Sequence, residues 1–336
     1  MVSPRQIFRD WSLPIAMIGG VLIYFAYVNI PFFDDTHAAA NRIIAVVQPL
    51  LIALMLFITF CKVRISEMRI TRWHVWLLAF QMLSFIALSL AVAFMPLSDA
   101  LRVIIESAML CLLCPTATAA AVITAKLGGS AASLISYTMA INVMVAVVAP
   151  FFLTLAHPVA DGSFFDSFLL IMGKVFPLLL SPLLAAELVR RFLPNIHSYI
   201  VSRGRNWPFY LWLVALSLAI AVTTRAIVHT SLPMYVMAGI AIVSFLCCVL
   251  QFAVGRRIAG CYGERVTGGQ ALGQKNTVFA IWLAYTFMTP VTAIAGGFYS
   301  LWHNIVNTGR VPLKLYSVYS PPQHPFGTIH KTKADT

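Results

Sequence analysis

Pro115 interrupts a long apolar segment of the sequence. It lies in the run CPTATAAAVITAKLGG, which begins at Cys114, and Thr116 and Thr118 follow it closely. A proline removes one backbone hydrogen-bond donor and disfavours helix at the residue before it. The two threonine hydroxyls can serve the backbone groups that this break frees, or they can bind a ligand.

Lys275 stands in a second interruption. The run TGGQALGQKNTVFAIWLAY begins at Thr267 and places three glycines, two glutamines, Lys275 and Asn276 in its first half. In lipid these groups are costly unless they face protein or water. The exposed ends of interrupted helices carry partial charge, which can hold an ion or an anionic group. Thr116, Thr118, Lys275 and Asn276 are therefore the predicted substrate-binding residues.

The composition indicates that these segments lie in a membrane. Of the 336 residues, 60% are hydrophobic and 10% are charged, whereas soluble domains carry about 25% charged residues. Because one membrane span needs about 20 apolar residues, the sequence predicts ten transmembrane helices in an all-α integral membrane protein. The predicted spans are about 13–33, 43–61, 74–96, 100–125, 131–156, 164–187, 207–228, 232–254, 267–287 and 289–307.

The basic residues predict the orientation of the spans. The net charge of +12 does not indicate a nucleic-acid partner, because the bases sit in short runs between apolar segments. Of the 23 Lys and Arg residues, Arg42, Arg102 and Arg225 fall on one side, Lys174 and Lys275 lie within spans, and the rest lie on the other side. By the positive-inside rule the richer side is cytoplasmic. We therefore expect a multi-pass protein of a bacterial inner membrane with both termini in the cytoplasm.

The two interruptions occupy matched positions. Residues of about 13–156 form spans one to five and residues of about 164–307 form spans six to ten, so each interruption falls in the fourth span of its half. Since five is odd, the second half would be inverted relative to the first. Broken helices in matching places of two inverted repeats are typical of a transporter's binding site. Alternatively, Pro115 is a plain kink and the polar residues join neighbouring helices.

The domain organisation is simple. Residues 1–307 are predicted to form one transporter domain, and residues 308–336 a basic, proline-containing cytoplasmic tail. Cys111 and Cys114 match C-x-x-C, but no second pair or histidine partner has zinc-like spacing. No catalytic residue, metal site or cofactor is predicted.

At the two interruptions the chain resembles the bile acid:sodium symporter family, which belongs to a superfamily that includes arsenite exporters. The family's fourth span carries Cys-Pro followed by small residues and a Thr, as in the run from Cys114. Its ninth span carries Glu-x-Gly-x-Gln-Asn, where this chain has ALGQKN at 271–276. Its last span has a Trp-His-Asn pattern, matched here by the run that ends at Asn304. The resemblance covers residues of about 10–307.

The resemblance implies a fold and a function. The fold has a core domain of spans 3–5 and 8–10, a panel domain of spans 1, 2, 6 and 7, and broken spans 4 and 9 that cross near the membrane centre. The function is secondary transport of a small organic anion by alternating access, typically with sodium. A protein of this kind is not an enzyme.

The chain departs from the family where the family binds sodium. The family's ligand positions fall on Ala120, Ala121, Ala271 and Lys275. Alanine supplies no side-chain oxygen and lysine supplies only donors, so sodium coupling is predicted to be altered or absent. The ammonium of Lys275 can take the cation's place, and the coupling ion is left open between H⁺ and Na⁺. The polar residues that remain in the cation-site region are Thr138, Gln81, Gln274 and Lys275.

Two other classes of function stay open. A polytopic membrane enzyme would need histidines and acids gathered near one face, and the eight histidines are scattered. A channel-like facilitator would need polar residues along several whole spans. One intramembrane acid, Glu106, lies two turns before Cys114 and is either functional or part of the outer interface near Asp99 and Arg102.

Overall fold

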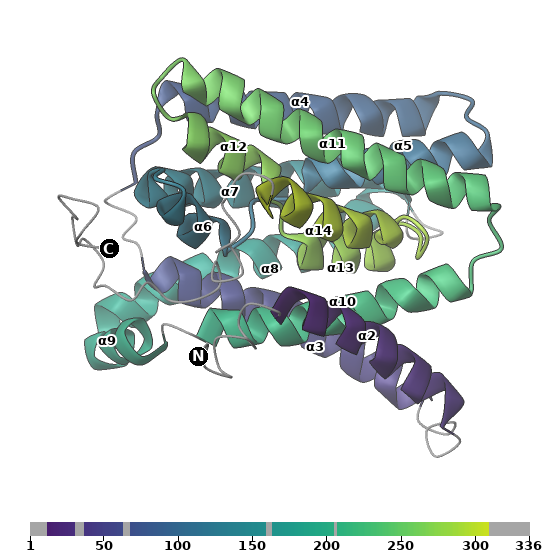
Figure 1. Ribbon diagram of the computed structural model, residues 1–336, viewed down its shortest axis with the longest axis horizontal. Coiled ribbons are helices and arrows are strands. Elements are labelled where there is room, and N and C mark those ends of the chain that lie inside the picture. Colours follow the sequence, from purple (N-terminus) through teal and green to yellow (C-terminus); the bar gives the residue numbers. More distant parts are fainter. Residues whose placement is uncertain (1–11, 31–36, 63–67, 159–162, 205–206, 309–336) are drawn as a thin grey trace.

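The computed structural model describes residues 12–30, 37–62, 68–158, 163–204 and 207–308 (Figure 1). The predicted tail, apart from residue 308, lies outside this described part. Within it every regular element is a helix, and the one β-type pairing is an isolated bridge. The helices are α2 (Ser12–Asn29), α3 (His37–Cys61), α4 (Arg72–Phe94), α5 (Asp99–Leu113), α6 (Ala120–Lys126), α7 (Ala131–Ala156), α8 (Phe164–Phe192), α9 (Pro194–Arg203), α10 (Trp207–Val228), α11 (Met234–Gly260), α12 (Arg265–Gly273), α13 (Thr277–Phe287) and α14 (Ala293–Thr308).

Six helices in the described part of the chain are long and apolar enough to cross a membrane. They are α4, α7, α8, α10, α11 and residues Arg42–Cys61 of α3. Large apolar side chains such as Phe94 and Leu184 stay exposed on them, as contact with lipid requires. The predicted multi-pass, all-α membrane fold is thereby confirmed.

Several predicted span bounds differ from the helix ends by four to six residues: α3 begins earlier, at His37, and α8 and α11 end later, at Phe192 and Gly260. The first helix ends at Asn29 rather than near residue 33, and the last begins at Ala293 rather than at residue 289. Pro290 and a local cap explain the later start, because the backbone N–H of Thr292 donates to Thr289 Oγ1 at 3.1 Å. A hydroxyl that binds a backbone donor in this way favours a turn over a helix.

The two expected interruptions are present. Cys114 ends α5 in an extended conformation, with φ −53° and ψ 135°, as expected for the residue before a proline. The chain resumes as α6 at Ala120. The second interruption separates α12 from α13 at residues 274–276.

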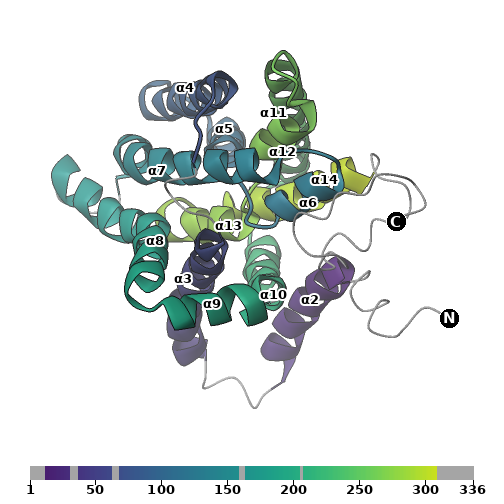
Figure 2. The ribbon, with the colours of Figure 1, turned by 90° about the vertical axis from the view of Figure 1, so that its left-hand side faces the viewer.

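The helices form two groups, with α4 and α11 along one side of the molecule and α2, α3 and α10 along the opposite side (Figures 1 and 2). The interrupted helices lie between these sides. In the first group α4 packs against α5 and α7, and α11 packs against α12, α14 and α5. In the second, α2 packs against α10, and α3 packs against α8 and α10.

Close glycine contacts hold α12 against α11. A Cβ atom added to Gly255 would lie 2.2 Å from the carbonyl oxygen of Gly268, and one added to Gly268 would lie 2.2 Å from Ala259 Cβ. Helices approach this closely in membranes when small residues line the contact. This contact fixes the half-helix that leads into the second interruption.

Candidate substrate site at the helix crossing

The two interrupted helices meet at their breaks. An antiparallel bridge joins Thr116 to Lys275. Because lipid offers no hydrogen-bond partners, a broken helix in a membrane needs such contacts for its backbone groups. The bridge is flanked by two backbone hydrogen bonds, from Ala117 N to Gln274 O (2.8 Å) and from Asn276 N to Pro115 O (2.9 Å).

Gln81 of α4 caps the C-terminal end of α5. Its Nε2 donates to the carbonyl oxygens of Leu113 and Cys114 at 3.0 and 2.9 Å. Its Oε1 accepts a 3.0 Å hydrogen bond from the hydroxyl of Tyr137 on α7. Gln81 was predicted to lie in the cation-site region, and in this structure both ends of its amide bind the protein itself.

Tyr299 of α14 caps the C-terminal end of α12 in a similar way. Its hydroxyl donates to Gly273 O at 2.8 Å. Gln251 of α11 donates from Nε2 to Tyr299 Oη at 3.1 Å and to Cys111 O at 3.2 Å, and so links the two half-helices. The sequence analysis missed both residues, although a glutamine in the middle of an apolar span was a usable signal.

The hydroxyls of Thr116 and Thr138 are also engaged. Thr116 is fully buried, and its Oγ1 donates to Ala271 O across the crossing at 2.6 Å. It thus takes the first of its two expected roles, the service of freed backbone groups. Thr138 donates to Leu134 O within its own helix at 2.9 Å.

Lys275 lies at the crossing with 1% of its surface exposed. Its Nζ has no hydrogen-bond partner among the described residues, so the carbonyls at the break do not neutralise it. Its electrostatic neighbours are the thiols of Cys111, Cys114 and Cys247. No group of three or more His, Cys, Asp or Glu side chains in the described part of the chain is arranged to hold a metal ion. A buried ammonium without a partner is unfavourable, so this amine requires either an anionic partner or the loss of its proton.

A small cavity opens beside the crossing. It has a volume of about 20 Å³, which is room for about one water molecule. Asn276 lies at its edge and caps α13, since its Oδ1 accepts from Phe279 N at 3.2 Å. Of the predicted site residues the cavity brings together Thr118, Gln274, Lys275 and Asn276, and Thr116, Thr138 and Gln81 are not among its lining residues. Met55 of α3, Trp212 of α10 and His303 of α14 also line it, so the cavity lies where the two helix groups meet.

Comparison with known proteins adds little to this geometry. No protein-family model matches the chain. Over 34 residues the chain is 74% identical to the uncharacterized protein YrkC of Bacillus subtilis (strain 168), a stretch that covers 10% of this chain and 18% of YrkC. The chain thus matches less than a fifth of the length of that relative, whose activity is not assigned.

Proposed function

We propose that this chain is a secondary transporter that moves a small organic anion across the membrane by alternating access. The observation that carries the proposal is the crossing of two interrupted helices at which Lys275 is buried with no hydrogen-bond partner among the described residues. An anion would supply the missing partner. The N-terminus of α13, which follows Asn276, adds partial positive charge at the same place. A carboxylate or a similar small anionic group fits this chemistry.

We also propose that the protein has ten membrane segments in two inverted repeats, formed by α2–α7 and by α8–α14 with α9 as an addition. The packing supports the proposal, because an exchange of the two halves converts several observed helix contacts into other observed contacts, although the contact of α7 with α8 has no such counterpart. The contact of α2 with α10 becomes that of α8 with α3, and the contact of α5 with α11 becomes that of α12 with α4. Likewise, the contact of α5 with α14 becomes that of α12 with α7.

The two helix groups would then act as the moving parts. In the family that the chain resembles, the core domain corresponds to α4–α7 with α11–α14, and the panel domain to α2, α3, α8 and α10. The cavity at Lys275 is walled by residues of both groups. Since its volume of about 20 Å³ is too small for an organic anion, the groups must separate to admit one. Separation on alternate sides of the membrane is the motion that alternating access requires.

The departures at the sodium positions support a mechanism with altered or absent sodium coupling. Ala120 and Ala271 are fully buried and offer no side-chain oxygen. The backbone carbonyl oxygen of Ala271 already accepts a hydrogen bond from the hydroxyl of Thr116. The amine of Lys275 lies where the resemblance places a sodium-binding amide. We therefore propose that a proton or the fixed ammonium replaces sodium, in a bacterial inner-membrane protein with cytoplasmic termini.

Uptake into proteoliposomes tests the proposed function. The purified full-length chain is reconstituted and offered a panel of radiolabelled organic anions, bile acids included, with sodium and proton gradients imposed separately. We expect saturable uptake of at least one anion, and its loss in Lys275→Met. The matched control is Lys174→Met, since Lys174 is an exposed lysine of α8 that lies 5.5 Å from the ring centroid of Phe287.

Three outcomes would contradict the proposal. Uptake of every anion at the rate of empty liposomes would remove the transport function. A linear, non-saturable flux would instead indicate a channel-like facilitator. Equal uptake by Lys275→Met and Lys174→Met would place the substrate away from the crossing.

A further inference from the structure

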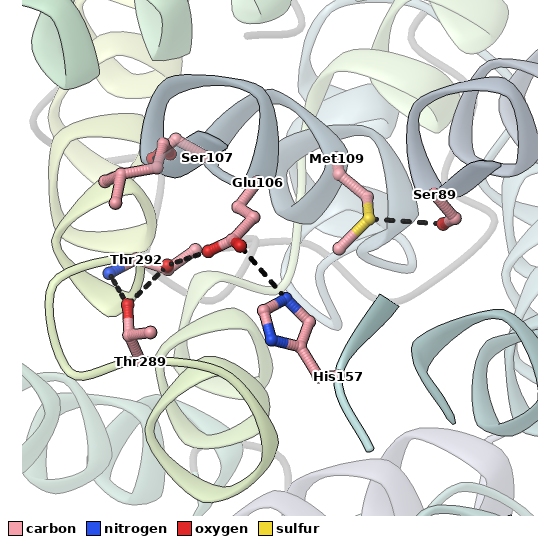
Figure 3. Close-up of polar contacts among 8 residues, drawn as sticks. Ser89, Glu106, Ser107, Met109, His157, Thr289 and Thr292 are labelled. Carbon is pink, nitrogen blue, oxygen red and sulfur yellow. Dashed lines mark hydrogen bonds and ion pairs between the residues drawn. The ribbon is translucent and has the colours of Figure 1, made fainter. Parts of the chain in front are cut away.

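A carboxyl–imidazole pair lies two turns before the end of α5 (Figure 3). Glu106 of α5 has 1% of its surface exposed. Its Oε1 lies 3.3 Å from Nε2 of His157, the residue that follows the last turn of α7. The side chain of His157 is 15% exposed, so it connects the buried carboxyl with the surface.

One threonine binds the other carboxyl oxygen, and a second threonine binds the first threonine. Thr292 donates from Oγ1 to Glu106 Oε2 at 3.1 Å, and its hydroxyl lies 2.7 Å from that of Thr289. Both threonines lie in the segment that joins α13 to α14 (Figure 3). Glu106 therefore ties one interrupted helix, α5, to the end of α7 and to the segment that follows the other interrupted helix.

Among the residues that the structure describes, Glu106 is the only acidic residue that contacts His157. The helices α4, α7, α11, α13 and α14 contain no Asp or Glu. From α5 itself, Arg102 interacts electrostatically with both Glu106 and His157. Other ionisable side chains of the packed helices lie elsewhere or face outward. They are Asp99 at the start of α5, Arg72 and His74 at the start of α4, Tyr137 within α7, Asp166 at the start of α8 and its Lys174, Glu187, Arg190 and Arg191, Arg256 and Arg257 at the end of α11, the exposed Tyr235 and Tyr285, Tyr299 and His303 within α14, and the thiols of Cys111, Cys247 and Cys248.

The Glu106–His157 contact has two possible protonation states near neutral pH. Burial lowers the pKa of His157 to about 4, and repulsion from Arg102 adds to this effect, so the imidazole is neutral near pH 7. The 3.3 Å contact is then not an ion pair, and its angles do not meet hydrogen-bond geometry. A small rotation of either side chain would let Glu106 donate to Nε2 as a carboxylic acid, or accept from Nε2–H as a carboxylate.

We propose that Glu106 and His157 form a proton-binding site of the protein. If the proposed transport function holds, this site makes the proton the coupling ion. On proton uptake, His157 Nδ1 takes a proton from water while the Nε2 proton moves to Glu106 Oε1, so that the Nδ1–H and Oε1–H bonds form and the Nε2–H bond breaks. The reverse steps return one proton to water. The ionised carboxylate attracts Arg102 and accepts from Thr292, whereas the protonated form loses the attraction to Arg102. Proton uptake would also weaken the hydrogen bond from Thr292, which holds α5 to the α13–α14 segment, because a neutral carboxyl group is a weaker acceptor than a carboxylate.

Infrared difference spectroscopy tests the site without any assumption about transport. The full-length protein in lipid nanodiscs is titrated with acid, and the absorption of protonated carboxyl groups is followed. We expect a pH-dependent band in the wild type and in the control Asp99→Asn, which removes an exposed acid from the same helix. Because the chain has 11 Asp and Glu residues, the wild-type spectrum minus the Glu106→Gln spectrum isolates the contribution of Glu106. This difference should contain one titrating band, and the midpoint of that band should shift in His157→Gln. A difference spectrum without a titrating band, or a midpoint unmoved in His157→Gln, would overturn the proposal.

A transport measurement separates this inference from the proposed function. Proteoliposomes that contain a pH-sensitive dye report proton movement while anion uptake is counted. We expect Glu106→Gln to lose the proton signal and Asp99→Asn to keep it. If no anion is transported but the infrared band still depends on Glu106, the transport proposal fails and the proton site stands. If Glu106→Gln moves protons with the anion as the wild type does, the proton site fails and transport stands.

Discussion

Thr116 donates a 2.6 Å hydrogen bond to the carbonyl oxygen of Ala271, from one interrupted helix to the other. The two residues are 155 positions apart in the chain, and both are fully buried. Ala271 stands where the resemblance places a glutamate side chain, so the polar group that this position offers is its backbone carbonyl. The bond fixes the crossing and uses one lone pair of the single oxygen that Ala271 offers.

Replacement of Thr116 by valine should destabilise the protein. The change removes the donor to Ala271 O, and an unpaired buried carbonyl costs about 1–3 kcal/mol. The control is Thr118→Val, because Thr118 lines the cavity rather than the crossing bond. The melting temperatures of the two variants in detergent give the comparison. Equal melting temperatures would show that the bond does not stabilise the crossing.

The Gln81–Tyr137 contact should behave as one unit. Tyr137→Phe leaves Gln81 Oε1 without its donor, and Gln81→Leu frees the carbonyls of Leu113 and Cys114. We expect Tyr137→Phe to cost about 1 kcal/mol and Gln81→Leu to cost more. In a double-mutant cycle the double variant should lose less stability than the sum of the single variants. Strict additivity would mean that Tyr137 does not orient the amide.

The sequence predicted the interruptions, because their cause is local. Pro115 and the polar residues around Lys275 disturb helices through their own backbone and side chains, whatever packs against them. The closing contacts of Gln251, Tyr299 and His157 were not predicted, since each depends on a carbonyl or carboxyl brought close by tertiary packing. For the same reason the sequence could not choose between the two roles of Thr116.

Replacement of Gly268 by alanine should displace α12. The new Cβ would lie 2.2 Å from Ala259 Cβ and 2.4 Å from the carbonyl oxygen of Gly255. Relief of these clashes requires a shift of the α11 backbone, which costs free energy of folding. We expect a melting temperature several degrees lower and a loss of transport. Gly19→Ala is the control, since nothing lies within 4 Å of its added Cβ. If both variants melt at the wild-type temperature, the close α11–α12 contact is not needed for the fold.

Transport should proceed without sodium if Lys275 replaces it. The amine lies at the crossing, fully buried, while Ala120 and Ala271 supply no side-chain ligand for a cation. Wild-type proteoliposomes should therefore take up the anion equally in sodium and in choline buffers. Saturable stimulation by sodium would refute the replacement.

Lys275 could take the place of sodium either by exchanging a proton in each transport cycle or by staying charged throughout. The variant Lys275→Gln distinguishes these two mechanisms. If the amine releases and rebinds a proton in each cycle, the glutamine variant should lose pH-dependent uptake, because an amide carries no exchangeable charge. If the ammonium stays charged and acts as a fixed counter-charge for the substrate, the variant should bind the anion more weakly at every pH. The uptake rate of both proteins is measured over a series of pH values and anion concentrations. Glu106→Gln serves as the comparison, since a proton carried at Glu106 predicts that this variant, and not Lys275→Gln, abolishes the pH dependence. A pH profile that survives in both variants would assign the proton to neither residue.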